Sequence, residues 1–127
     1  MSERHKIEQL LRDLYASRIS ANLDGLAGLF AQDARFRIAG TSDGKPIAIS
    51  AAGREQIRPW LGLLVKTFRI SNHEILSMTI EGARAAVHWE AQIHSKVTGV
   101  IVPTEFVDLV TAQDGLISSY IEFFVPR

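Results

Sequence analysis

The segment Thr104–Phe124, TEFVDLVTAQDGLISSYIEFF, decides how the rest of the chain is arranged. Two stretches of alternating apolar residues flank Gln113-Asp114-Gly115, which is typical of a β-hairpin in which Gly115 takes a positive φ. A three-residue loop would set Asp108 opposite Tyr120. Because side chains alternate along a strand, one face of the hairpin carries Thr104, Phe106, Asp108, Tyr120, Glu122 and Phe124.

The two faces of this hairpin differ in chemistry. The face just described combines two carboxylates and a phenol with aromatic rings, which predicts a pocket on this side. The opposite face is almost entirely apolar, which predicts a second buried surface. Its residues are Val107, Leu109, Ile117, Ile121, Phe123 and Val125.

The composition indicates one soluble domain spanning residues 1–127. The chain is long enough to bury a core, 46% of its residues are apolar, and its formal net charge is zero. It has no basic stripe for nucleic acid and no apolar stretch near the roughly 20 residues that span a bilayer. With no cysteine there is no disulfide or thiolate nucleophile, and the charged N-terminus does not resemble a signal peptide. We therefore expect a cytoplasmic protein that binds neither nucleic acid nor membrane.

Two helices are expected at the start of the chain. Ser2 is a suitable N-cap for the first helix, whose apolar stripe leads to Tyr15 and Arg18. A second helix is expected to begin after Asn22 and to include Phe30.

A strand and a third helix follow. Alternation over residues 34–39 predicts a strand with Phe36 and Ile38 on one face, and residues 40–52 read as a loop or an irregular hairpin. Residues 54–68 have helical periodicity. The apolar side of this third helix carries Ile57, Trp60, Leu61, Leu64 and Phe68.

From residue 69 onward the pattern predicts four long antiparallel strands. A two-residue turn at Thr98-Gly99 would set Trp89 opposite Asp108 on the pocket face. His88 and His94 would then point away from the pocket, and their spacing along one strand splays them too far for a metal site. Helices gathered first and strands last indicate an α+β fold, with one curved antiparallel sheet and the helices on one face.

The order of these pieces resembles the SnoaL-like, nuclear-transport-factor-2-like superfamily. Residues 14–40, LYASRISANLDGLAGLFAQDARFRIAG, carry an aromatic on the first helix, a small-residue hinge, a Leu-Asp pair, Leu-Phe, and an Asp-Ala pair before a strand. Gly53–Ile57 resembles the family's entry to its third helix, and Phe106–Leu109 followed by Asp114–Ile117 resembles its last hairpin. The resemblance implies a cystatin-like cone, in which a bent sheet wraps three helices around an apolar pocket. Members include ketosteroid isomerases, epoxide hydrolases, polyketide cyclases and non-enzymatic modules, so the fold alone does not give the function.

The resemblance to ketosteroid isomerases implies roles for particular residues. Those enzymes use a tyrosine on the first helix and an aspartic acid on the penultimate strand as an oxyanion hole, with an aspartate on the first strand as the base. Asp108 matches the penultimate-strand position, and Tyr15 matches the helix position if the hinge is one residue shorter. The base position falls on Ile38, which cannot accept a proton, so Glu122 is the candidate base. The Arg-x-Asp motif of limonene epoxide hydrolases is absent.

The candidate catalytic residues are therefore Asp108, Tyr15, Glu122 and Tyr120. The expected pocket lining consists of Arg18, Phe36, Ile38, Trp60, Trp89, Phe106 and Phe124. Each has a structural alternative: Asp108 as a hydrogen-bonded core acid, Glu122 as a solvated group at the mouth, and the tyrosines as core fillers. Arg18 either pairs with Asp108 or Glu122 across the pocket or lies along the surface with its stem packed; of the two, we expect the solvent position. His73 reads as a surface group.

Two functions from different classes remain open at the level of sequence. One is an isomerase or cyclase that applies general acid/base chemistry to a small apolar carbonyl compound, with no cofactor and no metal. The other is a non-catalytic ligand-binding or dimerisation module of the same fold. In either case the outer apolar face of the hairpin predicts a homodimer joined through the sheet. The alternative is a monomer in which the chain end, residues 125–127, folds over that face.

Overall fold

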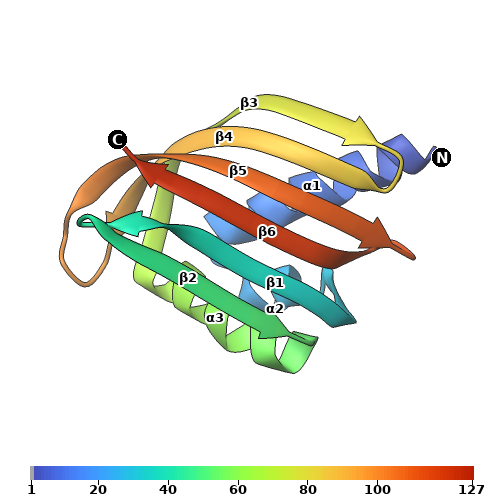
Figure 1. Ribbon diagram of the computed structural model, residues 1–127, viewed down its shortest axis with the longest axis horizontal. Coiled ribbons are helices and arrows are strands. Elements are labelled where there is room, and N and C mark those ends of the chain that lie inside the picture. The colour runs from blue at the N-terminus through green and yellow to red at the C-terminus, as the bar shows by residue number, and fades with distance from the viewer. Residues whose placement is uncertain (1) are drawn as a thin grey trace.

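The computed structural model describes residues 2–127, which form three helices and six strands (Figure 1). In chain order the elements are α1 (Glu3–Ile19), α2 (Leu23–Ala27), β1 (Phe30–Ser42), β2 (Lys45–Ala52), α3 (Arg54–Thr67), β3 (Phe68–Glu81), β4 (Arg84–Ser95), β5 (Ile101–Gln113) and β6 (Leu116–Pro126). Within residues 2–127 no helix is both long enough and apolar enough to cross a membrane.

All six strands belong to one sheet, in the order β2-β1-β6-β5-β4-β3. Neighbouring strands run antiparallel except β1 and β6, which are parallel. The sheet is curved and open, with α1 near β3 and β4 and α3 near β1 and β2 (Figure 1). These features confirm the predicted α+β fold, although the expected purely antiparallel sheet contains one parallel pair.

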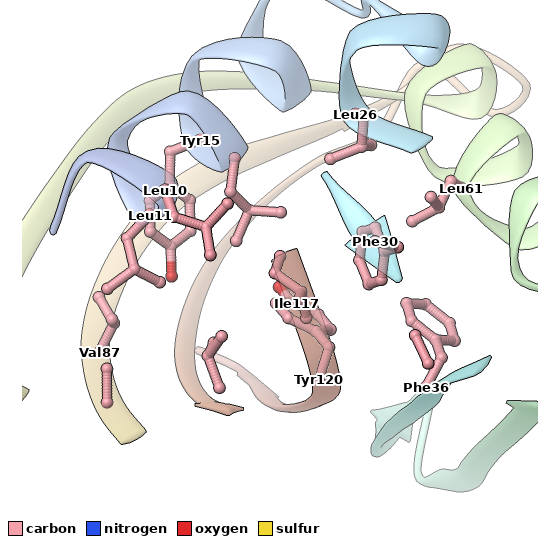
Figure 2. Close-up of a cluster of buried hydrophobic side chains, with 14 of the residues drawn as sticks. Leu10, Leu11, Tyr15, Leu26, Phe30, Phe36, Leu61, Val87, Ile117 and Tyr120 are labelled. Atoms are coloured by element: carbon pink, nitrogen blue, oxygen red, sulfur yellow. The ribbon is translucent and has the colours of Figure 1, made fainter. Parts of the chain in front are cut away.

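The core lies between the helices and the inner face of the sheet (Figure 2). Helix α1 contributes Leu10, Leu11 and Tyr15, which recur at helical spacing and are almost fully buried. The sheet supplies large side chains that face them from β1, β4 and β6, among them Phe30, Val87 and Ile117. Burial of apolar surface on this one side of the sheet therefore holds the helices in place.

The boundary between α2 and β1 differs from the sequence prediction. Helix α2 ends at Ala27, and Phe30, expected in the helix, is the first residue of β1 and pairs with Ile117. Tertiary pairing with β6 overrides the apolar spacing that suggested a longer helix. Residues 40–52 form the hairpin of β1 and β2, closed by Asp43 and Gly44, both with positive φ.

The hairpin of β5 and β6 has a register shifted by two residues from the prediction. Asp108 pairs with Glu122, and Tyr120 pairs with Val110. The turn has two residues, Asp114 and Gly115, both with positive φ, and a bulge follows on β6, where Ser118 is the extra residue. The β4–β5 pairing is also shifted by two, because the loop after Ser95 is longer than expected, so that Trp89 pairs with Phe106.

Ile117 is the one residue of the predicted outer face that lies fully inside. It is completely buried in the core, whereas Val107, Leu109, Phe123 and Val125 are exposed on the outer face as expected. The irregular pairing between Phe30 and Arg35 on β1 and the extra residue Ser118 on β6 break the alternation near the start of β6. Ile117 and Tyr120, three positions apart, consequently both face the helices.

Candidate functional site

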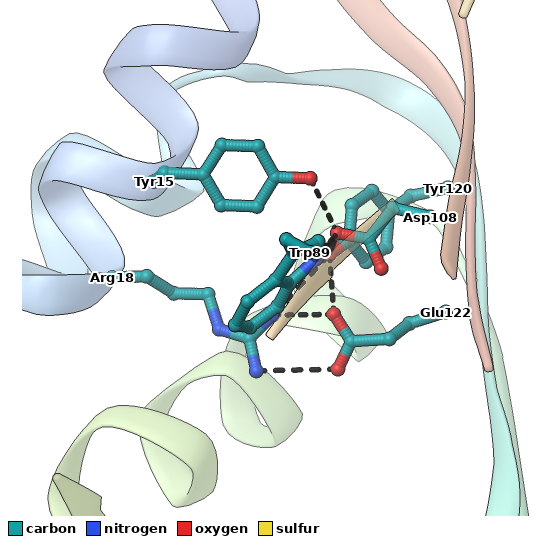
Figure 3. A network of polar contacts seen from close by, with 6 residues as sticks. All are labelled: Tyr15, Arg18, Trp89, Asp108, Tyr120 and Glu122. Atoms are coloured by element: carbon teal, nitrogen blue, oxygen red, sulfur yellow. Dashed lines mark hydrogen bonds and ion pairs between the residues drawn. The ribbon is translucent and has the colours of Figure 1, made fainter. Parts of the chain in front are cut away.

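Six polar or aromatic side chains meet between α1 and the middle of the sheet (Figure 3). Helix α1 supplies Tyr15 and Arg18, which lie about one helical turn apart on the same face. The sheet supplies Trp89 from β4, Asp108 from β5, and Tyr120 and Glu122 from β6. The predicted alternation of β5 and β6 therefore brings the two carboxylates to one interior location.

Asp108 is fully buried, and all of its hydrogen bonds are made by one of its two oxygens. Oδ2 lies 2.6 Å from the Tyr15 hydroxyl, 2.8 Å from Nε1 of Trp89 and 2.9 Å from the Tyr120 hydroxyl. The other oxygen, Oδ1, is buried and has no partner within residues 2–127. An unsatisfied buried oxygen costs about 1–3 kcal/mol, so Oδ1 is a place where a bound molecule would find an unused hydrogen-bonding group.

Glu122 differs from Asp108 because it is paired with a cation. Arg18 Nη1 and Nη2 donate to Glu122 Oε2 and Oε1 at 2.5 and 3.2 Å, and only 8% of the arginine side chain is exposed. Burial raises the pKa of Glu122, but the charge and hydrogen bonds of Arg18, together with hydrogen bonds from Asp108 and Tyr120, outweigh burial and lower the pKa below the usual value. Glu122 and Arg18 are both charged. The expected solvent position of Arg18 is wrong, and the alternative that it pairs with Glu122 is confirmed.

A count of protons fixes the state of Asp108. The Tyr120 hydroxyl lies 2.9 Å from Asp108 Oδ2 and 2.7 Å from Glu122 Oε2. Each of these two hydrogen bonds needs its own proton, and the hydroxyl supplies only one. The other proton must be on one of the two carboxyl groups, and Arg18 keeps Glu122 ionised. Asp108 is therefore the protonated partner: it donates to Tyr120, which in turn donates to Glu122.

The pKa of Asp108 agrees with this count. Burial in an apolar site raises it well above the usual carboxyl range, and the charge of Glu122 raises it further. Burial also raises the pKa of Tyr15 and of Tyr120, with the neighbouring carboxylates adding to the effect. The interior site thus contains one ion pair and three neutral acids.

Aromatic rings enclose this network. Phe106 stacks on Trp89 at 3.8 Å between ring centroids, and Phe36 stacks on Tyr120 at 5.8 Å. Ile38, at the position where the resemblance implies a base, is buried beside Glu122 through the β1–β6 register. The remaining predicted lining residues lie further out: Phe124 is half-buried against Gly40, and Trp60 is half-buried at the edge of the core on α3.

His73 lies beside this network, although it was expected on the surface. Its ring packs against Tyr15 at 5.1 Å and against Trp89 at 5.0 Å between centroids, and its Nε2 is buried without a partner within the described chain. Burial lowers the pKa of His73, and the nearby charge of Arg18 lowers it further. One signal in the sequence was available: Ile70 and Ile75 lie five positions apart, which breaks the period of two and indicates a bulge between them.

The surface has two notable hollows. One, of about 540 Å³, is formed by α3 and the start of α2, and the other, of about 450 Å³, lies over β1, β2 and β6 and includes Phe36 and Tyr120 in its lining. Neither is lined by Asp108 or Glu122. Within residues 2–127 no group of three or more His, Asp or Glu side chains is arranged to hold a metal ion.

The sequence matches the family model of the SnoaL-like domain over residues 11–120. The chain therefore belongs to the SnoaL-like domain family, and the resemblance inferred from its motifs is confirmed. No protein with a curated description matches the sequence.

Solved structures with the same fold are numerous and distant in sequence. A structure described as a candidate isomerase from Bacillus subtilis has a TM-score of 0.83 at 18% identity, covering 98% of this chain and 89% of that one. An NTF2-like protein from Burkholderia xenovorans has a TM-score of 0.77 at 21% identity, covering 98% and 92%. An epoxide hydrolase of limonene-epoxide-hydrolase type from M. tuberculosis has a TM-score of 0.72 at 11% identity, covering 94% and 83%. At these identities the likeness is one of fold.

Proposed function

We propose that this protein binds a small apolar carbonyl compound and catalyses its isomerisation or cyclisation by general acid/base chemistry. Asp108 is the proposed acid, with Tyr15 and Tyr120 as supporting donors and Glu122 as the candidate base. Two observations on Asp108 carry the proposal. The contacts of the Tyr120 hydroxyl with both carboxyl groups require Asp108 to be protonated, and its Oδ1 is buried without a hydrogen-bond partner within residues 2–127. A neutral carboxyl in an apolar site donates strongly to the oxygen of a developing enolate.

The charge of the site supports an uncharged ligand. Arg18 and Glu122 neutralise one another, and Asp108 and both tyrosines are uncharged. With a ligand bound, the Tyr120 hydroxyl would turn its proton from Glu122 to Asp108 Oδ2, and the carboxyl proton would then stand on Oδ1, the oxygen that lacks a partner within residues 2–127. In that state Oδ1 donates a hydrogen bond to the ligand carbonyl. The surrounding Trp89 and Phe106 favour an apolar frame around the carbonyl.

The geometry supports the role of Asp108 as the acid better than the role of Glu122 as the base. Both oxygens of Glu122 receive hydrogen bonds from Arg18, and Oε2 also contacts Tyr120. A carboxylate with a lowered pKa is a weak base. For Glu122 to accept a proton, its ion pair with Arg18 has to open.

The experiment combines a binding probe with a turnover assay. The probe is 2-naphthol, whose hydroxyl resembles an enol on a flat apolar frame and whose fluorescence reports binding and ionisation. Turnover is followed by ultraviolet absorbance as β,γ-unsaturated ketones become conjugated. We expect Asp108→Asn to lower the rate about 10²-fold, the usual cost of losing one oxyanion donor. The control is Asp114→Asn, because Asp114 is exposed in the β5–β6 turn.

The outcomes separate the two function classes. The proposal would be refuted if the wild-type protein neither binds 2-naphthol nor converts any of the β,γ-unsaturated ketones assayed. Equal rates for Asp108→Asn and Asp114→Asn would refute the role of Asp108. Naphthol binding without turnover would favour the non-catalytic module, which is the second candidate because neither of the two surface hollows is lined by Asp108 or Glu122.

We also propose a homodimer joined through the outer face of the sheet. Leu109 pairs directly with Ile121, and Val107 pairs with Phe123, so these residues form a continuous apolar patch. Val107, Leu109 and Phe123 are each more than a third exposed. A patch of this kind is usually covered by a partner. Arg127 pairs with Glu90 and contributes a charged rim beside the patch.

A further inference from the structure

The inner face of β3 contains a single polar side chain. Two bulges interrupt the pairing of β3 with β4, one between Ser71 and Glu74 and one between Ile75 and Ser77. As a result the residues that turn inward are Ile70, His73, Ile75, Met78 and Ile80. The four others are aliphatic or thioether side chains that pack against the core.

The backbone before His73 adopts a conformation that places this ring inward. Asn72 has a φ of 53°, in the left-handed region that asparagine tolerates better than most residues. Without the extra residue of the bulge, alternation from Ile70 would turn Asn72 inward and His73 outward. Bulges that redirect a side chain are common beside active sites.

His73 lies against the same two rings that hold Asp108. Tyr15 and Trp89 donate to Asp108 Oδ2, and the His73 ring packs at 5.1 and 5.0 Å from their centroids. Its Nε2 is shielded from water and lacks a partner within residues 2–127. The site therefore contains two buried atoms without partners: an oxygen of a neutral acid and a nitrogen of an imidazole.

We propose that His73 is the proton acceptor of this site, an inference that rests on the proposed function. Nε2 takes a proton from the carbon beside the ligand carbonyl, and the electrons of the broken C–H bond form an enolate whose oxygen accepts a hydrogen bond from Asp108. The imidazolium then returns the proton to a different carbon of the same enolate. The substrate class is therefore a β,γ-unsaturated ketone or a related compound with an acidic carbon–hydrogen bond, and no other reactant is needed.

The groups around His73 suit this role. Tyr15 and Arg18 face it from α1 and Trp89 faces it from β4, and the neutral Asp108 is hydrogen-bonded to Tyr15 and Trp89. Burial and the arginine charge keep the imidazole unprotonated at neutral pH, which is the form that accepts a proton. The same charge opposes a lasting imidazolium, so the proton is passed on. Glu122, with both oxygens bonded to Arg18, lacks this freedom.

The test compares His73→Gln with His5→Gln, a change at an exposed position on α1. With the ketone on which the wild-type protein is most active, we expect His73→Gln to lower kcat about 10²–10⁴-fold, the usual contribution of a general base. We expect KM and the affinity for 2-naphthol to stay within about threefold, because the acid half of the site remains intact. His5→Gln should match the wild-type protein in every measurement.

The pH profile gives a second, independent measurement that needs no variant. The wild-type kcat/KM should fall as pH drops below the usual histidine range, with a kinetic pKa equal to the pKa of His73 measured by NMR. Disagreement between those two pKa values would overturn the inference, as would a His73→Gln enzyme with unchanged kcat. If the wild-type protein converts no ketone, the proposed function itself fails and the role of His73 fails with it. If His73→Gln keeps the wild-type turnover, the role of His73 as proton acceptor is refuted and the proposed function of the protein stands.

Discussion

The ion pair between Arg18 and Glu122 allows a quantitative prediction. Replacing Arg18 by Met keeps most of the apolar stem but leaves Glu122, which is 2% exposed, without its cation. Removing one partner of a buried pair typically costs about 3–5 kcal/mol. For a protein of this size, with a urea m-value of about 2 kcal/mol/M, the unfolding midpoint should fall by about 1.5–2.5 M.

The dependence of this loss on pH has a definite sign. In the wild-type protein the pKa of Glu122 is lowered, so its contribution to stability is present above the unfolded carboxyl pKa of about 4.3 and disappears as pH falls. In Arg18→Met the buried carboxyl has a raised pKa instead. The variant should therefore be most stable near or below pH 4.3 and lose stability as the pH rises toward neutrality.

Urea titrations followed by tryptophan fluorescence at pH 4.5 and pH 7.5 measure both effects. The control is Arg58→Met, which breaks an exposed pair with Asp24 and should cost at most about 1 kcal/mol. Adding Glu122→Met to Arg18→Met should recover much of the loss, because the unpaired buried charge is gone. Equal midpoints for Arg18→Met and Arg58→Met at pH 7.5 would show that the interior pair does not exist in solution.

Three further predictions follow from the site and the sheet. The side-chain carboxyl carbon of Asp108, followed by NMR, should remain protonated far above the usual pKa of about 3.9, and a titration at or below that value would remove its role as a neutral donor. Phe106→Ala should destabilise the protein by about 3–5 kcal/mol, because the ring is buried against Trp89, whereas His88→Ala on the outer face should cost about 0.5 kcal/mol; comparable denaturation midpoints would contradict this. Sedimentation at micromolar concentration should give a dimer that Leu109→Glu with Phe123→Glu converts to a monomer, and a 14.1 kDa wild-type species would exclude the dimer.

The sequence allowed the interior face of the sheet to be predicted more reliably than the strand partners. Asp108, Tyr120 and Glu122 were expected on one face, and they are. Their partners were each wrong by two residues, because turn lengths and a bulge set the register. A shift of two preserves the face of every side chain, since the period of a strand is two. Ile117 changed face because the strand is irregular there.

The charge arrangement of the site could not be derived from sequence patterns. Arg18 follows Tyr15 by three positions, so a shared helix face was foreseeable, but whether a long side chain turns inward depends on a partner from a strand about 100 residues later. His73 depends on a bulge whose position is set by packing against β4 as well as by Asn72. Both are long-range effects, and local periodicity does not contain them.

The position of β6 in the sheet has a consequence for how the molecule assembles. β6 lies between β1 and β5, and its pairing with β1 joins residues about 80 positions apart, such as Phe36 and Tyr120. During synthesis, β1 and β2 cannot join the rest of the sheet until residues 116–126 have left the ribosome. The nascent chain therefore carries the inner edge of β1 unpaired over most of its elongation, which makes it a target for chaperones or for pairing with another chain. The carboxylate pair of the site is completed by the same event that closes the sheet.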